Sequence, residues 1–101
     1  MAVAFLQELP GMTQEQYDQI AETLQRRFKT SEERIFHVAG PMEGGWRVVD
    51  VWESQEAVDK FFQEQLGPAL QEVGLAAATP PQFWPVHNML SGPEHYLYSA
   101  S

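Results

Sequence analysis

The chain has 101 residues and a mass of 11.5 kDa, the usual size of one domain with a single core. Apolar residues make up 44% and charged residues 20%, a globular composition that argues against a disordered tail or linker. Fourteen acidic and six basic residues give a net charge of −8, which argues against nucleic acid and anionic membrane surfaces as partners.

Two elements are predicted in the first part of the chain. Residues 2–8 are apolar or β-tolerant, and Pro10-Gly11 then ends the run, as at a strand followed by a turn. Thr13 and Gln16 have the spacing of a capping box, and a helix is expected from about Thr13 to Phe28. The apolar residues that recur at helical spacing are Tyr17, Ile20, Ala21, Leu24 and Phe28.

The middle of the chain predicts a β-hairpin. Residues 34–41 (RIFHVAGP) and 45–52 (GWRVVDVW) are rich in β-branched and aromatic residues, which favour strands. Pro41 ends the first run, and the glycine pair Gly44-Gly45 can adopt positive φ. The two runs are therefore expected to pair directly.

A second helix and a last strand follow the hairpin. Ser54 can cap a helix with Val58, Phe61, Phe62 and Leu66 on one face. Pro68 should kink or restart that helix, because it removes a backbone donor. Pro80-Pro81 marks a boundary, and residues 82–88 (QFWPVHN) are expected to form an edge strand that tolerates a proline. The tail 91–101 is left unassigned.

The order β-α-β-β-α-β is that of a ferredoxin-like α+β fold, a four-stranded antiparallel sheet with two helices on one face. Residues 1–101 are therefore treated as a single domain. Both alternation sets of the hairpin are apolar: Phe36, Val38, Val49 and Val51 on one side, and Ile35, Ala39, Val48 and Trp52 on the other. Since two helices cover one face, a second copy of the chain is expected to cover the other, giving a homodimer whose interface the tail 91–101 could extend.

The hairpin also predicts a pair of chemically active residues. A symmetric loop of two or four residues would place Pro41 opposite Trp46, and His37 opposite Asp50. Paired Cβ atoms lie about 4.5–5.5 Å apart, so the carboxylate can hold one imidazole nitrogen and leave the other as a general base. Trp46 and Trp52 share this face and would give an aromatic ligand flat walls. A purely structural His37–Asp50 pair, with the tryptophans as core, is the alternative.

Metal and cofactor sites have little support in the sequence. His87 is expected two strands away from His37, too far to share a metal, and His95 is expected to be solvated. Without cysteine there is no disulfide, thiolate site or cysteine nucleophile, and nucleotide-binding and serine-hydrolase motifs are missing. The N-terminus lacks a signal-peptide pattern, and no apolar run reaches the length of a membrane span. A cytoplasmic protein with no metal and no cofactor is expected.

The element order and residues 50–54 (DVWES), followed by Glu56-Ala57, resemble the antibiotic biosynthesis monooxygenase (ABM) superfamily of dimeric α/β barrel proteins. The resemblance covers nearly the whole chain. It implies a cavity between sheet and helices with Trp52 on its wall. Members of that superfamily include cofactor-independent oxygenases of polyketide quinols and haem-degrading enzymes, and related barrels include polyketide cyclases.

Two departures from the family pattern limit what the resemblance implies. Members that bind haem place a histidine on the second helix, where this chain has Phe61 or Gln71. Gln7 is the nearest amide to the asparagine that oxygenases carry on the first strand. Haem ligation in the family manner is therefore not expected.

Three functional hypotheses follow. The first is a small cofactor-independent, monooxygenase-like enzyme that deprotonates an aromatic or polyketide-like substrate, with His37 as base and Asp50 orienting it. A polyketide cyclase- or isomerase-like enzyme would use the same step. The second is a non-catalytic homodimer that binds a small molecule, and the third treats both sheet faces as dimer core. The residues expected to contact the substrate are Trp46, Trp52 and Phe61.

Overall fold

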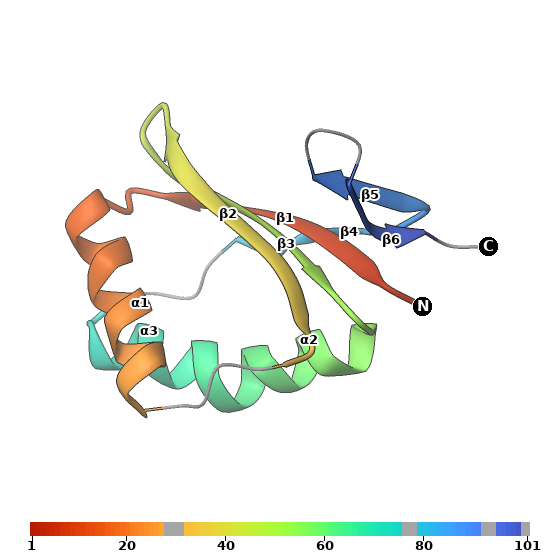
Figure 1. Ribbon diagram of the computed structural model, residues 1–101. Helices are drawn as coiled ribbons and strands as arrows, with labels where there is room; N and C mark the ends of the chain where they lie inside the picture. Colours follow the sequence, from red (N-terminus) through yellow and green to blue (C-terminus); the bar gives the residue numbers. More distant parts are fainter. Residues whose placement is uncertain (28–31, 76–78, 92–94, 100–101) are drawn as a thin grey trace.

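A four-stranded antiparallel sheet in the order β2-β3-β1-β4 carries its helices on one face (Figure 1). The computed structural model describes residues 1–27, 32–75, 79–91 and 95–99. The strands of this sheet are β1 (Val3–Pro10), β2 (Arg34–Met42), β3 (Gly45–Trp52) and β4 (Gln82–Pro85). The predicted ferredoxin-like α+β fold is confirmed, including the separation of β2 and β4 by two strands.

The helices begin where the sequence predicts. The helical elements are α1 (Gln14–Arg27), α2 (Gln55–Phe61), η1 (Phe62–Leu66) and α3 (Gly67–Glu72). At α1, the backbone N–H of Gln16 donates to the Thr13 hydroxyl at 3.1 Å, and the N–H of Thr13 donates to the Gln16 side chain at 3.0 Å. At α2, the Ser54 hydroxyl accepts from the N–H of Ala57 at 3.1 Å. The expected end of the first helix, Phe28, lies outside the described residues.

The second helical segment changes its pitch just before Pro68. A proline ring collides with the carbonyl four residues earlier in a regular α-helix. Here the chain forms one π-helical turn, η1, in which the N–H of Gly67 donates to the carbonyl of Phe62, five residues earlier. The break expected at Pro68 is thus a π turn that leads into α3.

The hairpin of β2 and β3 has the register that the glycine pair predicts. Met42 lies opposite Gly45 across a two-residue turn, and Gly44 in that turn has a φ of 75°. The same register places His37 opposite Asp50. A Cβ on Gly45 would lie 2.5 Å from a backbone oxygen of β1, so glycine is required for the close approach of these strands.

A β-bulge interrupts β2 close to its first residue. Arg34 pairs with Trp52 and Phe36 pairs with Val51, which leaves Ile35 as the extra residue. The side chain of Ile35 packs with the buried cluster around Val51, on the face away from the helices. The prediction that Ile35 shares a face with Trp52 is therefore wrong, because it assumed regular alternation.

The main core lies between the sheet and the helices. Trp52, Phe5 and Val58 are the largest side chains that are almost completely buried, at 1%, 1% and 0% exposure. They come from β3, β1 and α2, so the core joins the two layers directly. The other members of this buried cluster are Val3, Val48, Ala57 and Phe61.

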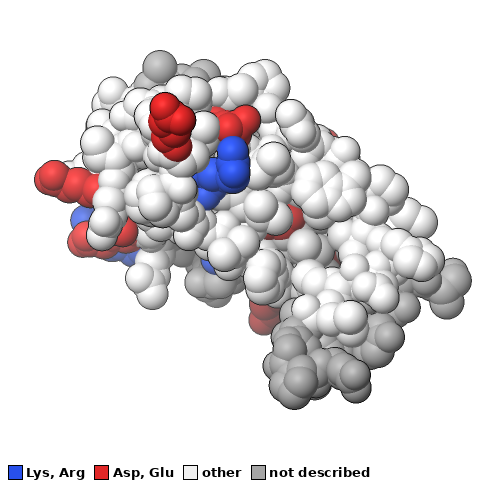
Figure 2. Space-filling model, turned by 90° about the horizontal axis from the view of Figure 1, so that it is seen from above, with Lys and Arg blue, Asp and Glu red and all other residues white. Residues whose placement is uncertain are grey.

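The opposite face of the sheet is apolar and partly open. The strand registers align Phe36, Val51, Ala4 and Trp84 in one row across this face. Phe36, Val38 and Trp84 keep 41%, 49% and 45% of their exposure. Viewed from that side, most of the surface is uncharged, and the charged side chains lie mainly toward one end of the molecule (Figure 2).

A second hairpin covers one end of the open face. Its strands are β5 (Asn88–Ser91) and β6 (His95–Ser99), and Met89 packs against the buried cluster around Val51 (Figure 1). The last strand of the main sheet is therefore shorter than predicted. It ends at Pro85, and the chain bends at His87 before β5 begins.

Candidate functional site

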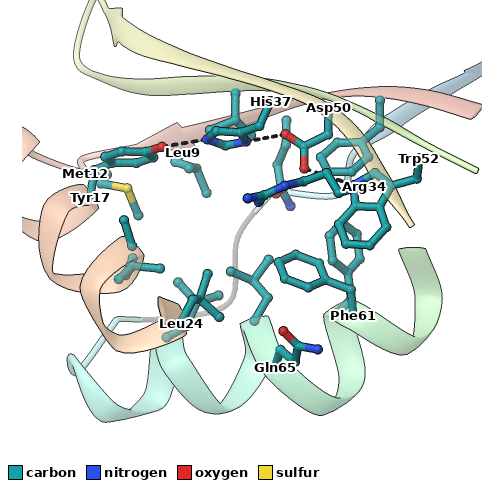
Figure 3. A pocket seen from close by; sticks show the side chains of 18 of the residues that line it. Leu9, Met12, Tyr17, Leu24, Arg34, His37, Asp50, Trp52, Phe61 and Gln65 are labelled. Atoms are coloured by element: carbon teal, nitrogen blue, oxygen red, sulfur yellow. Dashed lines mark hydrogen bonds and ion pairs between the residues drawn. The ribbon is translucent and has the colours of Figure 1, made fainter. Parts of the chain in front are cut away.

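A cavity of about 290 Å³ lies between the sheet and the helices (Figure 3). Most of its wall is apolar, as in small-molecule sites, and a few polar groups converge on it. The main apolar side chains of the wall are Phe5, Leu24, Trp52, Phe61, Phe62 and Leu66. The polar ones are Gln7, Tyr17, Gln25, Arg34, His37, Asp50 and Gln65.

A chain of four side chains runs along the sheet side of the cavity (Figure 3). His37 Nδ1 lies 2.5 Å from Asp50 Oδ1, and His37 Nε2 lies 2.6 Å from the hydroxyl of Tyr17. The second oxygen of Asp50 accepts a hydrogen bond of 3.0 Å from Trp52 Nε1. The Asp50 side chain is 4% exposed and that of His37 28% exposed, so solvent reaches the imidazole end more easily. We call these four residues the relay.

The donor and the acceptor of each hydrogen bond in the relay can be assigned. An ionised Asp50 only accepts hydrogen bonds, so it holds the hydrogen on His37 Nδ1 and leaves Nε2 as an acceptor for the Tyr17 hydroxyl. Burial raises the pKa of Tyr17, and the negative charge of Asp50 raises it further. Tyr17 therefore keeps its proton at neutral pH and donates it to His37.

The expected site residues differ in where they lie. His37, Asp50, Trp52 and Phe61 all line the cavity, and the rings of Trp52 and Phe61 are in contact with centroids 4.8 Å apart. Trp46 does not line it, although it lies on the same face of β3. Its ring packs against that of Tyr17 at 5.4 Å, because α1 covers this end of the strand.

Four polar residues of the cavity were not predicted: Tyr17, Gln25, Arg34 and Gln65. The sequence pattern placed Tyr17 in the apolar stripe of a helix, and its hydroxyl instead occupies the imidazole nitrogen that was expected to be free. The side chain of Arg34 reaches into the cavity because of the bulge in β2 (Figure 3). A tyrosine hydroxyl within an otherwise apolar helix face was the one available signal.

Metal and haem ligands are not grouped around the cavity. Within the described ranges, no three histidine or acidic side chains are placed to hold a metal ion. From α2 and η1 the cavity receives Phe61, Phe62, Gln65 and Leu66, and none of these side chains is a ligand for haem iron. These two elements therefore offer no haem ligand in the manner expected of the family. No helix in the described part of the chain has the length and apolar character needed to cross a membrane.

Solved structures share this fold, whereas no protein-family model and no curated protein sequence matches the chain. The structural-genomics protein YJCS is 17% identical, with a TM-score of 0.62 over 85% of this chain and 99% of that one. A protein assigned as an antibiotic biosynthesis monooxygenase from Chloroflexus aurantiacus J-10-fl is 13% identical, with a TM-score of 0.59 over 85% and 93%. A single-residue variant of SnoaB, a cofactor-independent oxygenase from Streptomyces nogalater, is 14% identical, with a TM-score of 0.58 over 92% and 98%. The chain thus has the fold of antibiotic biosynthesis monooxygenase-like proteins.

Proposed function

We propose that this protein is a small cofactor-independent enzyme, monooxygenase-like in its chemistry, that removes a proton from an aromatic or polyketide-like substrate. The observation that carries the proposal is the relay itself, which ends in Tyr17 at an aromatic-lined cavity. A pocket that only binds an apolar molecule does not need a polar chain in its wall, and buried polar groups are costly unless each is hydrogen-bonded.

Tyr17 contacts the substrate in this mechanism, and His37 acts through it. As the hydroxyl of Tyr17 accepts the substrate proton, its own proton moves to His37 Nε2 over the 2.6 Å contact. Asp50 stabilises the imidazolium that forms, because it holds Nδ1–H at 2.5 Å. The step leaves one negative charge on the substrate and one positive charge on His37, so the net charge of the site and its ligand is unchanged.

The deprotonated substrate can react with dioxygen without a cofactor. A ring methylene activated by neighbouring carbonyl or phenol groups loses one proton to the relay, and the carbanion reduces dioxygen to give a hydroperoxide on that carbon. Loss of water then leaves a carbonyl. The net change is CH₂ plus O₂ to C=O plus H₂O, so the substrate carbon is oxidised and dioxygen is the only oxidant.

The aromatic wall positions the substrate in this proposal. Trp52 and Phe61 present contacting rings next to the relay, and Phe5 and Phe62 continue the aromatic surface with ring centroids 5.3 Å apart. Aromatic faces of this kind hold planar ring systems by offset or edge contacts. A planar ligand lying against them would have its edge toward Tyr17.

The first test is dioxygen uptake with a panel of anthrones, which carry an activated ring methylene, measured with an oxygen electrode against buffer. We expect uptake with the wild-type protein. In Tyr17→Phe we expect turnover to fall by about tenfold or more at a similar KM, because the ring is kept and the proton path is lost. Tyr98→Phe, on the β6 strand at the other face of the sheet, is the matched control and should keep its turnover.

Three alternative results of this test would change the proposal. Rearranged product without dioxygen uptake would replace oxygenation by cyclisation or isomerisation, with the same proton transfer. Binding of the panel without any product would replace the enzyme by a small-molecule-binding protein. Equal turnover in wild type and Tyr17→Phe would remove Tyr17 from the mechanism.

We also propose that two copies of the chain pair through the open face of the sheet. Phe36 and Trp84 lie in one row of this face and Val38 in the next, neither row carries a charged residue, and a two-fold axis would bury this apolar surface against itself. Val38→Glu should weaken dimerisation by about a hundredfold, because it places an unpaired charge in the interface. Sedimentation at several concentrations measures this, with Gln19→Glu at an exposed position of α1 as control. A wild-type particle of 11.5 kDa at micromolar concentration would contradict the dimer.

A further inference from the structure

Arg34 presents a charged group to the cavity. The β-bulge turns its side chain to the helix side of the sheet, where the guanidinium points into the cavity below His37 and Asp50 (Figure 3). The ion pairs of arginine in the described part of the chain join Arg26 to Glu72 and Arg47 to Glu8. No described carboxylate lies within ion-pairing distance of Arg34.

A basic side chain is unusual in this cavity. The chain has only six basic residues against fourteen acidic ones, and Arg34 is the one lysine or arginine among the described residues of the cavity wall. Most of the cavity wall is aromatic or apolar, so a negative group beside the guanidinium would be attracted more strongly than in water, although the Asp50 carboxylate on the same wall opposes a second negative charge. An arginine placed so that its donors face a cavity is suited to an anion.

The guanidinium and the relay face the same space. The positive charge of Arg34 lowers the pKa of Tyr17, against the effects of burial and of Asp50, which raise it. A ligand that fills the cavity would therefore lie within the field of both Arg34 and Tyr17. The proton acceptor and the positive charge are arranged around one volume of about 290 Å³.

We propose that Arg34 is a substrate-binding residue that selects planar aromatic anions in which two oxygens lie side by side, such as an ionised enol next to a carbonyl. The planar fork of arginine donors matches two neighbouring oxygens better than a single point charge does. This inference rests on the proposed function and narrows its substrate to the acidic members of the aromatic and polyketide-like class. A carboxylate on an aromatic ring offers the same pair of oxygens and is the second source of this chemistry.

Arg34 would act on the reaction as well as on binding. Proton transfer to Tyr17 leaves negative charge that spreads from the substrate carbon to the adjacent carbonyl oxygen. The guanidinium stabilises that oxygen as the charge develops, so the proton leaves more easily. Arg34 would thus contribute to transition-state stabilisation as well as to affinity.

The test compares three bicyclic probes by titration calorimetry at neutral pH. The probes are 2-hydroxy-1,4-naphthoquinone, which is ionised and has an enolate oxygen beside a carbonyl, 2-naphthoate, which has a carboxylate, and 2-methyl-1,4-naphthoquinone, which is neutral. We expect wild type to bind the ionised quinone about ten- to a hundredfold more tightly than the neutral one. Arg34→Gln should abolish this preference by weakening the anion alone.

Two further variants separate charge from structure. Arg34→Lys keeps the charge but not the planar fork, so it should keep part of the preference. Arg26→Gln removes an arginine charge from the surface of α1, where the side chain is 60% exposed, and should bind all probes like wild type. Thermal unfolding of each variant verifies that the fold is kept, and Arg34→Lys provides the comparison if Arg34→Gln does not fold.

The outcomes distinguish this inference from the proposed function. Equal binding of the ionised and neutral quinones by wild type, unchanged in Arg34→Gln, would overturn the role of Arg34 and leave an aromatic-binding cavity in place. Binding of none of the probes would overturn both. Tighter binding of 2-naphthoate than of the ionised quinone would support Arg34 as the anion site and assign it to a carboxylate.

Discussion

Replacing Asp50 with asparagine is expected to lower turnover by about 10²–10⁴-fold while KM changes little. The carboxylate accepts from two donors, His37 Nδ1 at 2.5 Å and Trp52 Nε1 at 3.0 Å. An amide has one acceptor oxygen, so it can satisfy one of these donors and turns its own NH₂ toward the other. If the amide donates to Nδ1, the imidazole hydrogen moves to Nε2, and His37 can no longer accept the proton of Tyr17.

The hydrogen position on His37 provides a readout that does not depend on turnover. Nitrogen-15 NMR distinguishes the two neutral tautomers, and we expect hydrogen on Nδ1 in the wild type and a shift toward Nε2 in Asp50→Asn. Asp59→Asn is the matched control, because its carboxylate accepts from Gln55 on the surface of α2. Wild-type turnover in Asp50→Asn would contradict the relay, and an unchanged tautomer with lost turnover would assign Asp50 a role other than orientation.

Truncating Trp52 to alanine is expected to cost about 3–5 kcal/mol of unfolding free energy. The side chain is 1% exposed, packs between the sheet and α2, and contacts Phe61 with ring centroids 4.8 Å apart. The substitution removes the contacts of a large ring and leaves a cavity beside the relay. Urea unfolding followed by circular dichroism measures the loss.

Trp52→Phe separates packing from hydrogen bonding at the same position. It keeps most of the apolar ring and removes the N–H that donates to Asp50, so the loss in unfolding free energy should be much smaller than for alanine. Its effect on turnover reports how far the indole N–H orients Asp50. A loss below about 1 kcal/mol for Trp52→Ala would show that this ring does not hold the two layers together.

The fold and the central pair were predictable because their signals are local. Capping at Thr13 and Ser54 locates the helix starts, and a two-residue turn at Gly44 sets the hairpin register without any information from the rest of the chain. That register alone brings His37 opposite Asp50. One correct turn was enough to locate half of the relay.

The remainder of the site depends on how the helices pack on the sheet, which the spacing of apolar residues in the sequence does not show. Tyr17 meets His37 only through the packing of α1 against the sheet, and in the same packing the Tyr17 ring lies against Trp46, which does not line the cavity. In the sequence, Tyr17 looks like core, and Trp46 was predicted to contact the substrate. The helix was predicted correctly. That its Tyr17 hydroxyl would occupy the second imidazole nitrogen of His37 could be seen only in the tertiary structure.

The bulge in β2 places the Arg34 side chain on the cavity side of the sheet and the Ile35 side chain on the outer face. The polarity of the cavity therefore depends on the backbone conformation at this position. If the strand ran regularly up to His37, Ile35 would take the inward place and Arg34 would project among the apolar side chains of the outer face. The same amino-acid sequence would then form a more apolar cavity and place a charged side chain on the outer face. For evolution, a one-residue slip at this position changes both surfaces at once. Relatives that differ here by a single insertion or deletion could therefore diverge sharply in ligand and in assembly.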